Sequence, residues 1–377
     1  MPRYDGLGTD AFRALRGPRV GSRLWPWSSE SQVTVMKKRH LFWILSAVIS
    51  GRLFAAGSDA ANTNSNPRVR ALLSYFQSLE ARSDKRVLSG QFVNFGNGAN
   101  LTLMNRIHSQ TGLWPAIIGV DYADFGKGAL TFEVPNRTAI DYSKAGGIVT
   151  VSAHLYNPAN PNRGGLRDKG VDLKTLLESG SETHTRWMAE LDQLAGGLQQ
   201  LKDAGVVVLW RPFHEMNGDW FWWGGQDPKT FVQLWRQMFD YFTQVKGLDN
   251  LLWVYGPNHG AKTADYYPGE RYVDLVGLDA YTDFIDPEHI KGYPEVARLG
   301  KPFGLSEFGP HGASNPPGDY DYRRLISGIQ TNFPKTVFFM SWNANWSLAR
   351  NTNVTEFLSH PWIANREDIP KSATSAP

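Results

Sequence analysis

Cysteine is absent from the 377 residues of this chain, which excludes disulfide bonds and thiolate metal sites. A glycine-rich phosphate loop after a first strand, typical of an open nucleotide-binding sheet, is also missing. No apolar run is long enough to remain in a bilayer as a stable anchor. Short-period internal repeats are absent, and nothing in the chain suggests a second folded domain.

Basic residues are scarce outside the first part of the chain. Residues 1–57 hold nine Lys and Arg against three Asp and Glu, and the remainder holds 30 basic against 33 acidic residues. The overall charge of +3 therefore hides a mildly acidic main part without a basic block. This balance argues against a nucleic acid as partner and favours a neutral ligand.

The first 57 residues predict an exported protein. Residues 1–35 are rich in Arg, Gly, Pro and Ser without a periodic apolar pattern, and we interpret them as an unstructured upstream extension. Residues 36–57 have a basic head, the apolar run Leu41 to Ile49 and small residues at the end, which is the pattern of a signal peptide. We expect a secreted or periplasmic protein without stable membrane insertion, although retention of the apolar run as a tether is an alternative.

The remaining chain predicts a single barrel domain. Residues 58–67 read as a polar linker, and apolar positions from Val69 to Leu79 recur at helical spacing. Strand-like apolar runs then alternate with helical segments until about residue 365, and residues 366–377 read as a disordered tail. The eight expected strands cover 87–92, 116–122, 148–155, 206–214, 251–255, 275–281, 303–308 and 337–342. This alternation indicates an α/β fold, a (β/α)₈ TIM barrel over residues 68–365.

One stretch after the fourth strand, from Trp210 to Gly224, combines charged and flat apolar groups. Glu215 lies there beside His214, and Trp220, Trp222 and Trp223 follow closely. Pyranose rings stack on indoles, and a glutamate among aromatic rings loses water and has a raised pKa, as a proton donor requires. The competing interpretation is an ion-paired strand end with tryptophans in the core.

A second glutamate, Glu307, ends the seventh strand, 92 positions after Glu215. In a barrel the carboxyl ends of all strands meet at one rim, where active sites lie. Two carboxyl groups across one barrel mouth suit cleavage of a glycosidic bond, in which one protonates the leaving oxygen and the other attacks the sugar or activates water. The sequence thus predicts a glycosidase.

These residues also carry a family resemblance. The run Arg211-Pro-Phe-His-Glu-Met-Asn-Gly218 with Trp220-Phe-Trp-Trp-Gly224 resembles glycoside hydrolase family 26, most of whose members are endo-β-1,4-mannanases. The stretches Gly277–Tyr281 and Ser306–Gly309 are similar to later motifs of that family. The resemblance runs from about Arg68 to about Asn365 and implies a retaining mechanism, with Glu215 as general acid/base and Glu307 as nucleophile.

The resemblance also implies roles for sugar-contacting side chains. His214 would hydrogen-bond the nucleophile or nearby sugar hydroxyls, while Trp220 and Tyr281 would surround the sugar being cleaved. Trp342 would lie beneath that sugar as a stacking platform, and His154 would line the site. Asp279 would orient neighbouring groups.

Arg211 stays open between sugar contact and an ion pair with the carboxylates. Weaker candidates for sugar contact are Tyr156 and Trp114 at distal positions, Phe308 and His259. No cofactor is expected.

The sequence leaves several alternatives. Members of the same family act on mixed-linkage β-glucan or β-xylan, or release mannobiose from chain ends. A non-catalytic carbohydrate-binding barrel would lack a carboxylate, and both are present. A zinc site is disfavoured because His154, His214 and His259 occur on different strands without close-spaced ligand pairs. We expect a polysaccharide of the β-mannan class as partner, and a monomer.

Overall fold

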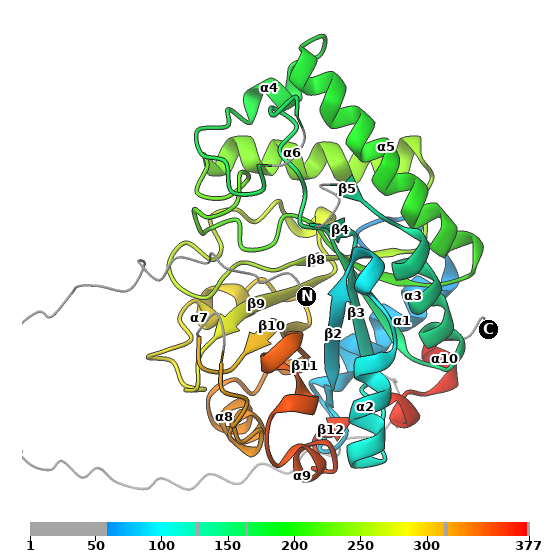
Figure 1. Cartoon of the computed structure of the whole chain (residues 1–377), viewed down its shortest axis with the longest axis vertical. Helices are drawn as coiled ribbons and strands as arrows, with labels where there is room; N and C mark the ends of the chain where they lie inside the picture. Colours follow the sequence, from blue (N-terminus) through cyan, green and yellow to red (C-terminus); the bar gives the residue numbers. More distant parts are fainter. Residues whose placement is uncertain (1–58, 126–128, 163–164, 313–315, 375–377) are drawn as a thin grey trace, which may run out of the picture. The chain divides into compact units, whose positions relative to one another are not determined.

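The computed structural model describes residues 59–125, 129–162, 165–312 and 316–374 (Figure 1). The expected upstream extension and signal peptide lie outside the described residues. Within them, no helix is both long and apolar enough to cross a membrane.

Eight parallel strands close into a barrel, which confirms the predicted fold. Strand β10 pairs with β9 and β11, and β11 pairs with β2, so the sheet returns to its first strand. In barrel order the strands are β2 (Gly90–Phe95), β3 (Ile117–Asp121), β6 (Ile148–Ser152), β7 (Val208–Arg211), β8 (Leu251–Tyr255), β9 (Leu275–Tyr281), β10 (Phe303–Gly309) and β11 (Thr336–Ser341).

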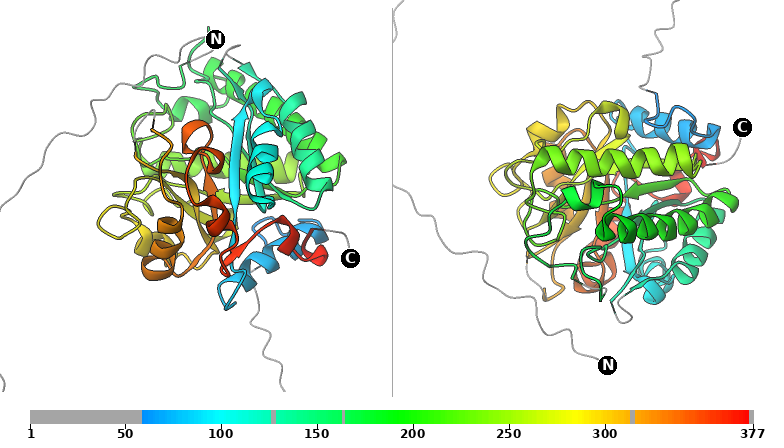
Figure 2. Two further views of the ribbon diagram at one scale, coloured as in Figure 1. Left: turned by 60° about the horizontal axis from the view of Figure 1, so that its bottom comes forward. Right: turned by 90° about the horizontal axis from the view of Figure 1, so that it is seen from above.

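Helices surround the strands, as Figures 1 and 2 show. They are α1 (Pro67–Leu79), α2 (Thr102–Thr111), α3 (Glu133–Lys144), α4 (Lys174–Leu177), α5 (Glu182–Asp203), α6 (Pro228–Asp240), α7 (Tyr293–Ala297), α8 (Arg323–Asn332), α9 (Val354–Leu358) and α10 (Lys371–Thr374). A short antiparallel hairpin, β4 (Ala123–Asp124) with β5 (Ala129–Leu130), follows β3. The hairpin was not expected from the sequence.

Local sequence explains where the longer helices begin. Asn66 accepts a hydrogen bond from the Val69 N–H ahead of α1, and Ser181 does the same for His184 in α5. Asp227 accepts from the Thr230 N–H, and Pro228 occupies the first turn of α6. Each side chain satisfies a backbone donor that the helix itself leaves free.

Alternation along the strands separates the core from the site. In β7, Val208 and Trp210 pack outward against the helices, while Leu209 belongs to the apolar cluster that contains residues of α1 and of several other strands. Successive side chains point to opposite faces of a strand. Arg211, two positions after Leu209, therefore points into the barrel at the carboxyl end of β7.

Three boundaries differ from the expected ones. The first predicted strand is split: β1 (Val87–Leu88) pairs with β11 and with β12 (Ile363–Ala364), and β2 begins only at Gly90. The expected linker packs on the barrel, because the Ala61 N–H donates to Asp274 and Asn62 donates to the Leu248 carbonyl. The expected tail forms a turn at 366–368 and α10, so it is structured as far as residue 374.

Candidate active site

The two predicted glutamates lie at the same end of the barrel. Glu307 is part of β10, pairs with Asp279 of β9, and is 3% exposed. Glu215 lies four residues beyond the end of β7 and is 9% exposed. One carboxylate oxygen from each of Glu215, Asp279 and Glu307 lies within 4.8 Å of the others. The two glutamates are therefore close enough to act on the same bond.

Glu215 is held in an unusual backbone conformation. Its φ is 57° and that of Phe213 is 49°, in the left-handed region that most residues avoid. The Glu215 N–H donates to the Gly256 carbonyl at 2.8 Å, which ties the β7 loop to the end of β8. Such strain, when fixed by neighbouring contacts, is common at functional sites.

Trp220 contacts the Glu215 carboxyl group directly. Its indole N–H donates to Glu215 Oε2 at 2.6 Å. The indole folds back over Gly218, where a Cβ atom would lie 2.3 Å from the ring. A glycine at this position therefore allows the loop to bring Trp220 onto the carboxyl group.

Glu307 accepts hydrogen bonds from two side chains. The Tyr281 hydroxyl donates to its Oε2 at 2.7 Å, and Arg211 donates to its Oε1. Arg211 also donates to Asp279 at 2.8 Å, and Ser306 donates to the other Asp279 oxygen at 2.6 Å. Donors aimed at a carboxylate favour its ionised form, as a nucleophile needs.

Burial and neighbouring charges raise the pKa values of Glu215 and Tyr281. Burial raises the pKa of Glu215 well above its ordinary value, and the nearby Glu307 and Asp279 charges raise it further. Burial and Glu307 raise the pKa of Tyr281 well above its ordinary value, which keeps its hydroxyl a donor. A protonated acid next to a hydrogen-bonded carboxylate is the pairing that glycosidic cleavage uses.

Arg211 acts here as an ion-pair partner. It is 1% exposed and hydrogen-bonded to two carboxylates, so the geometry favours this role over contact with a sugar. The Asp279 and Glu307 charges raise the Arg211 pKa above its already high value, against the effect of burial. A carboxylate trio of this kind has the donors of a divalent-cation site, but the guanidinium already supplies the positive charge.

The two predicted histidines face each other. His214 Nε2 lies 3.1 Å from His154 Nε2, and His154 Nδ1 lies 2.8 Å from an oxygen of Asp121. Ser152 also donates to Asp121, at 2.5 Å. Asp121 was not anticipated as a site residue, although an aspartate at the end of the second barrel strand was a readable signal.

Trp342 lies beside this histidine pair. It follows β11, is 9% exposed, and its ring is 4.9 Å from Phe92 and 5.7 Å from Phe95. Phe95 in turn contacts Phe125, which is 38% exposed, with ring centroids 4.9 Å apart. Phe95 and Phe125 were not predicted to lie near the site, because nothing in their local sequence distinguishes them from core residues.

Four aromatic residues considered for sugar contact are structural. Trp222 and Trp223 are fully buried, and they donate to the backbone carbonyls of Leu155 and His214. Phe308 is fully buried against Tyr320 and Tyr322. Trp114 stacks on His108 just before β3, and Arg366 covers its ring, so it lies at the amino end of the barrel. Whether each of these rings faces the site or the core depends on the direction of its strand or loop.

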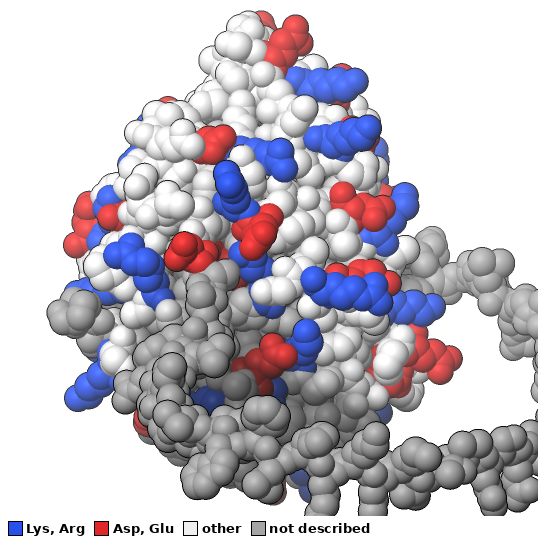
Figure 3. Space-filling model, turned by 180° about the vertical axis from the view of Figure 1, so that it is seen from behind, with Lys and Arg blue, Asp and Glu red and all other residues white. Residues whose placement is uncertain are grey.

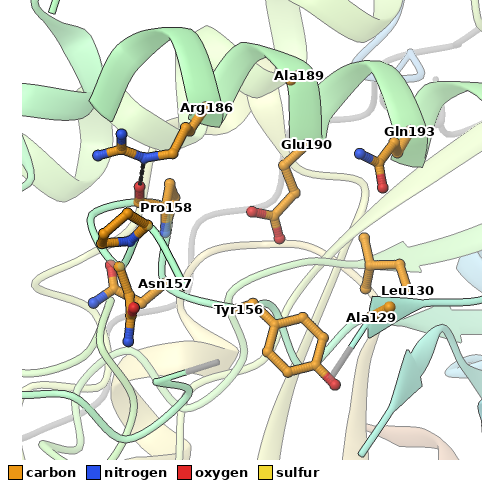
Figure 4. A pocket seen from close by; sticks show the side chains of 11 residues that line it. Ala129, Leu130, Tyr156, Asn157, Pro158, Arg186, Ala189, Glu190 and Gln193 are labelled. Atoms are coloured by element: carbon orange, nitrogen blue, oxygen red, sulfur yellow. Dashed lines mark hydrogen bonds between the residues drawn. The ribbon is translucent and has the colours of Figure 1, made fainter. Parts of the chain in front are cut away.

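A hollow lies outside the carboxylate centre, between α5 and the loops after β3 and β6 (Figure 4). Tyr156, Arg186 and Glu190 are among its lining residues, together with Ala129, Leu130, Asn157, Pro158, Asn160, Pro161, Ala189 and Gln193. The Tyr156 hydroxyl donates to the Asp124 carbonyl at 3.0 Å, which connects this hollow to the hairpin that carries Phe125. His259 lies in the loop after β8, where its N–H donates to the Asp279 carbonyl.

The molecular face in Figure 3 has positive and negative side chains interspersed over the part that is not grey. Such mixing on this face agrees with the expectation of a neutral ligand.

Comparisons with known proteins agree with this geometry. A profile of Glycosyl hydrolase family 26 matches residues 61–368. A mannan endo-1,4-beta-mannosidase of Bacillus subtilis (strain 168) is 37% identical over 347 residues, which cover 87% of this chain and 94% of that protein. A second Bacillus subtilis protein of the same name is 39% identical over 329 residues, 82% of this chain and 89% of its own length. The structure of Bacillus subtilis mannanase man26 superposes with a TM-score of 0.76 at 35% identity, covering 83% of this chain and 96% of that one.

Proposed function

From its membership of glycosyl hydrolase family 26, we propose that this chain is an endo-acting hydrolase of β-1,4-mannosidic bonds in mannan, glucomannan or galactomannan. The observation that carries the proposal is the pair of buried glutamates, with oxygens within 4.8 Å and two different hydrogen-bond environments. The names of the similar proteins support mannan as substrate over glucan or xylan.

The first chemical step breaks the glycosidic bond. Glu215, protonated because of its burial, gives its proton to the leaving oxygen while Glu307 attacks the anomeric carbon and forms a covalent glycosyl-enzyme. Glu215 then takes a proton from water, whose oxygen attacks the same carbon and releases Glu307. Two inversions at one carbon retain its configuration.

The surrounding side chains hold the sugar and the carboxylates. Trp342 is the platform beneath the reacting ring, and His154 and Trp220 line the same space. Tyr281 and Arg211 orient Glu307 through the hydrogen bonds they donate to it. Arg211 serves the reaction through these carboxylates and not through the sugar.

The hollow in Figure 4 suits sugar units beyond the cleaved bond. Its ring of Tyr156 offers an apolar face, and the amide of Gln193 offers a donor and an acceptor for hydroxyl groups. A neutral, hydroxyl-rich ligand fits this mixture.

The test is product profiling on β-1,4-mannan, mixed-linkage β-glucan and β-1,4-xylan with the wild type, Glu215→Ala and Glu307→Ala. We expect the wild type to cut mannan into short oligosaccharides and both variants to lose at least about 10²–10⁴-fold in rate. Dominant cleavage of glucan or xylan would overturn the substrate, and full activity of either variant would overturn that residue's assignment. Mannobiose as the sole early product would indicate exo action.

We further propose that residues 36–57 direct export and are removed, and that the mature protein is a monomer. Amino-terminal sequencing of the exported product tests the first statement, since a retained apolar run would leave a tethered protein. Sedimentation analysis tests the second.

A further inference from the structure

The buried group that the proposed reaction leaves unexplained is Asp121. It is 2% exposed and accepts four hydrogen bonds, from Ser152, from both the ring and the N–H of His154, and from the Ala123 N–H. Burial raises the Asp121 pKa, but its contacts with His154, Ser152 and Ala123 together lower it by more, so the pKa lies below its ordinary value. A hydrogen bond of this kind fixes which ring nitrogen of a histidine carries a proton.

The contact between the histidine rings requires one shared proton. His154 Nε2 and His214 Nε2 are 3.1 Å apart, so one nitrogen must donate and the other must accept. Because His154 Nδ1 faces the Asp121 carboxylate, that nitrogen carries a proton. A neutral His154 then has a bare Nε2, and His214 must donate from its own Nε2.

The opposite arrangement places a proton where it has no partner. If His154 carried protons on both nitrogens, His214 would hold its proton on Nδ1. That atom is buried and has no hydrogen-bond partner in the described part of the chain. An orphaned buried N–H is rarer and costlier than a bare acceptor. Burial, Arg211 and His154 also lower the His214 pKa well below its ordinary value, which agrees with a neutral ring.

We propose that Asp121 is a positioning residue for the hydrolytic reaction: it sets the tautomers of His154 and His214 and thereby holds the segment that carries Glu215. The connection to Glu215 is short. His214 is the preceding residue, its carbonyl accepts from Trp223, and its ring is fixed between Phe221 and His154. The expected effect of Asp121 on the rate rests on the proposed function. The predicted tautomers of His154 and His214 do not depend on it.

The arrangement also narrows what His214 can do. A ring whose Nε2–H is given to His154 has only a bare, buried Nδ1 left. His214 therefore does not donate to Glu307, which was one of the two roles that the family resemblance implied, the other being contact with sugar hydroxyls. Its contribution to the site is the placement of the next residue.

Asp121→Asn is the decisive variant, because asparagine keeps the shape of the side chain. Its carbonyl oxygen can still accept from Ala123 and from the His154 N–H, while its amide donates to Ser152 and to His154 Nδ1. His154 must then carry its proton on Nε2, and His214 must become the acceptor. The pair is predicted to reverse without loss of packing, at the cost of placing a proton on His214 Nδ1, which has no partner in the described part of the chain.

The experiment combines ¹⁵N NMR of histidine-labelled protein with steady-state kinetics on mannan. Ring nitrogen shifts distinguish protonated from bare nitrogens, and His154→Gln and His214→Gln provide the assignments. We expect the wild type to carry protons on His154 Nδ1 and His214 Nε2, and Asp121→Asn to reverse both. With mannan as substrate, kcat should fall about 10–100-fold, in the range that small misplacement of a catalytic group costs, with KM changed less than about twofold.

Two controls separate positioning from folding. Asp274→Asn changes another buried carboxylate, which accepts from Ala61 and Trp253 away from the histidines, and should lower stability without altering the histidine signals or kcat. Ser152→Ala removes one donor to Asp121 and should leave the tautomers unchanged, so it tests the proposal even if Asp121→Asn folds poorly.

Different wild-type tautomers, or unreversed tautomers in folded Asp121→Asn, would overturn the proposal. Reversed tautomers with unchanged kcat would overturn the role in the reaction. A wild type that cleaves no glycan but shows the expected tautomers would refute the proposed function instead.

Discussion

The hydrogen bond from Trp220 to Glu215 should set the upper pH limit of the enzyme. This indole N–H, 2.6 Å from Glu215 Oε2, lowers the pKa of a carboxyl group that burial raises. Trp220→Phe removes the donor and keeps an aromatic ring. The carboxylate form then loses a stabilising contact, so the pKa of Glu215 rises further and the acid stays protonated to higher pH.

The expected size of the Glu215 pKa shift follows from the strength of this hydrogen bond. A hydrogen bond to a charged group contributes about 1.5–3 kcal/mol, and about 1.4 kcal/mol corresponds to one pKa unit. We therefore expect the alkaline limb of the kcat/KM profile to move upward by about 1–2 pH units. That limb reports the acid of the free enzyme. A lower maximal rate should accompany the shift, because the acid is also less firmly oriented.

The assay is the pH dependence of kcat/KM on a soluble mannan, with Trp222→Phe as the matched control. The fully buried Trp222 indole donates to the Leu155 carbonyl and not to either glutamate, so its loss should reduce stability but leave the limb in place. An unmoved or lowered limb in Trp220→Phe, in protein that remains folded across the range, would refute our reasoning about the acid.

Two further substitutions test the carboxylate network. Arg211→Met leaves Asp279 and Glu307 buried without their cation, so it should lower the free energy of unfolding by about 3–5 kcal/mol at pH 7. Burial raises the pKa of Asp279 to about 8 although Arg211 lowers it. Without Arg211 this carboxyl group binds a proton more readily, so the deficit should be largest above pH 8 and shrink as pH falls. Chemical denaturation at several pH values checks this, and the surface variant Arg323→Met, whose ion pair with Asp321 is exposed, should change stability far less. Tyr281→Phe should lower kcat about 10–100-fold through loss of the donor to Glu307. Tyr322→Phe, whose hydroxyl contacts Ser341 and a backbone carbonyl, should leave kcat within about threefold in the same assay.

The sequence alone determined the architecture and the two glutamates. Buried strands alternating with helices admit few folds, and a barrel brings the ends of distant strands to one rim. Glu215 and Glu307 could therefore be paired across 92 positions without coordinates. The clustering of polar groups at strand ends also singled out Tyr281, Trp342 and His154.

Only the tertiary structure decided which neighbours of these residues face the site. Trp220 and Trp222 are two positions apart, yet the loop folds one indole onto Glu215 and buries the other, which donates to the Leu155 carbonyl. The conformation at Glu215, with φ of 57°, has no local sequence signal. Side-chain direction in a loop depends on such dihedral angles, and these are fixed by contacts with other elements.

The positions of the charged groups relative to one another also depend on the tertiary structure. Arg211 joins Asp279 and Glu307, and Asp121 reaches His214 through His154, because five different strands and their following loops place these groups within hydrogen-bond range. Hydrogen bonds act over about 3 Å, whereas a sequence pattern places a side chain only at the end of a strand. The closed barrel sets strand register and burial. These fix the distances between the groups and thereby which atoms carry protons.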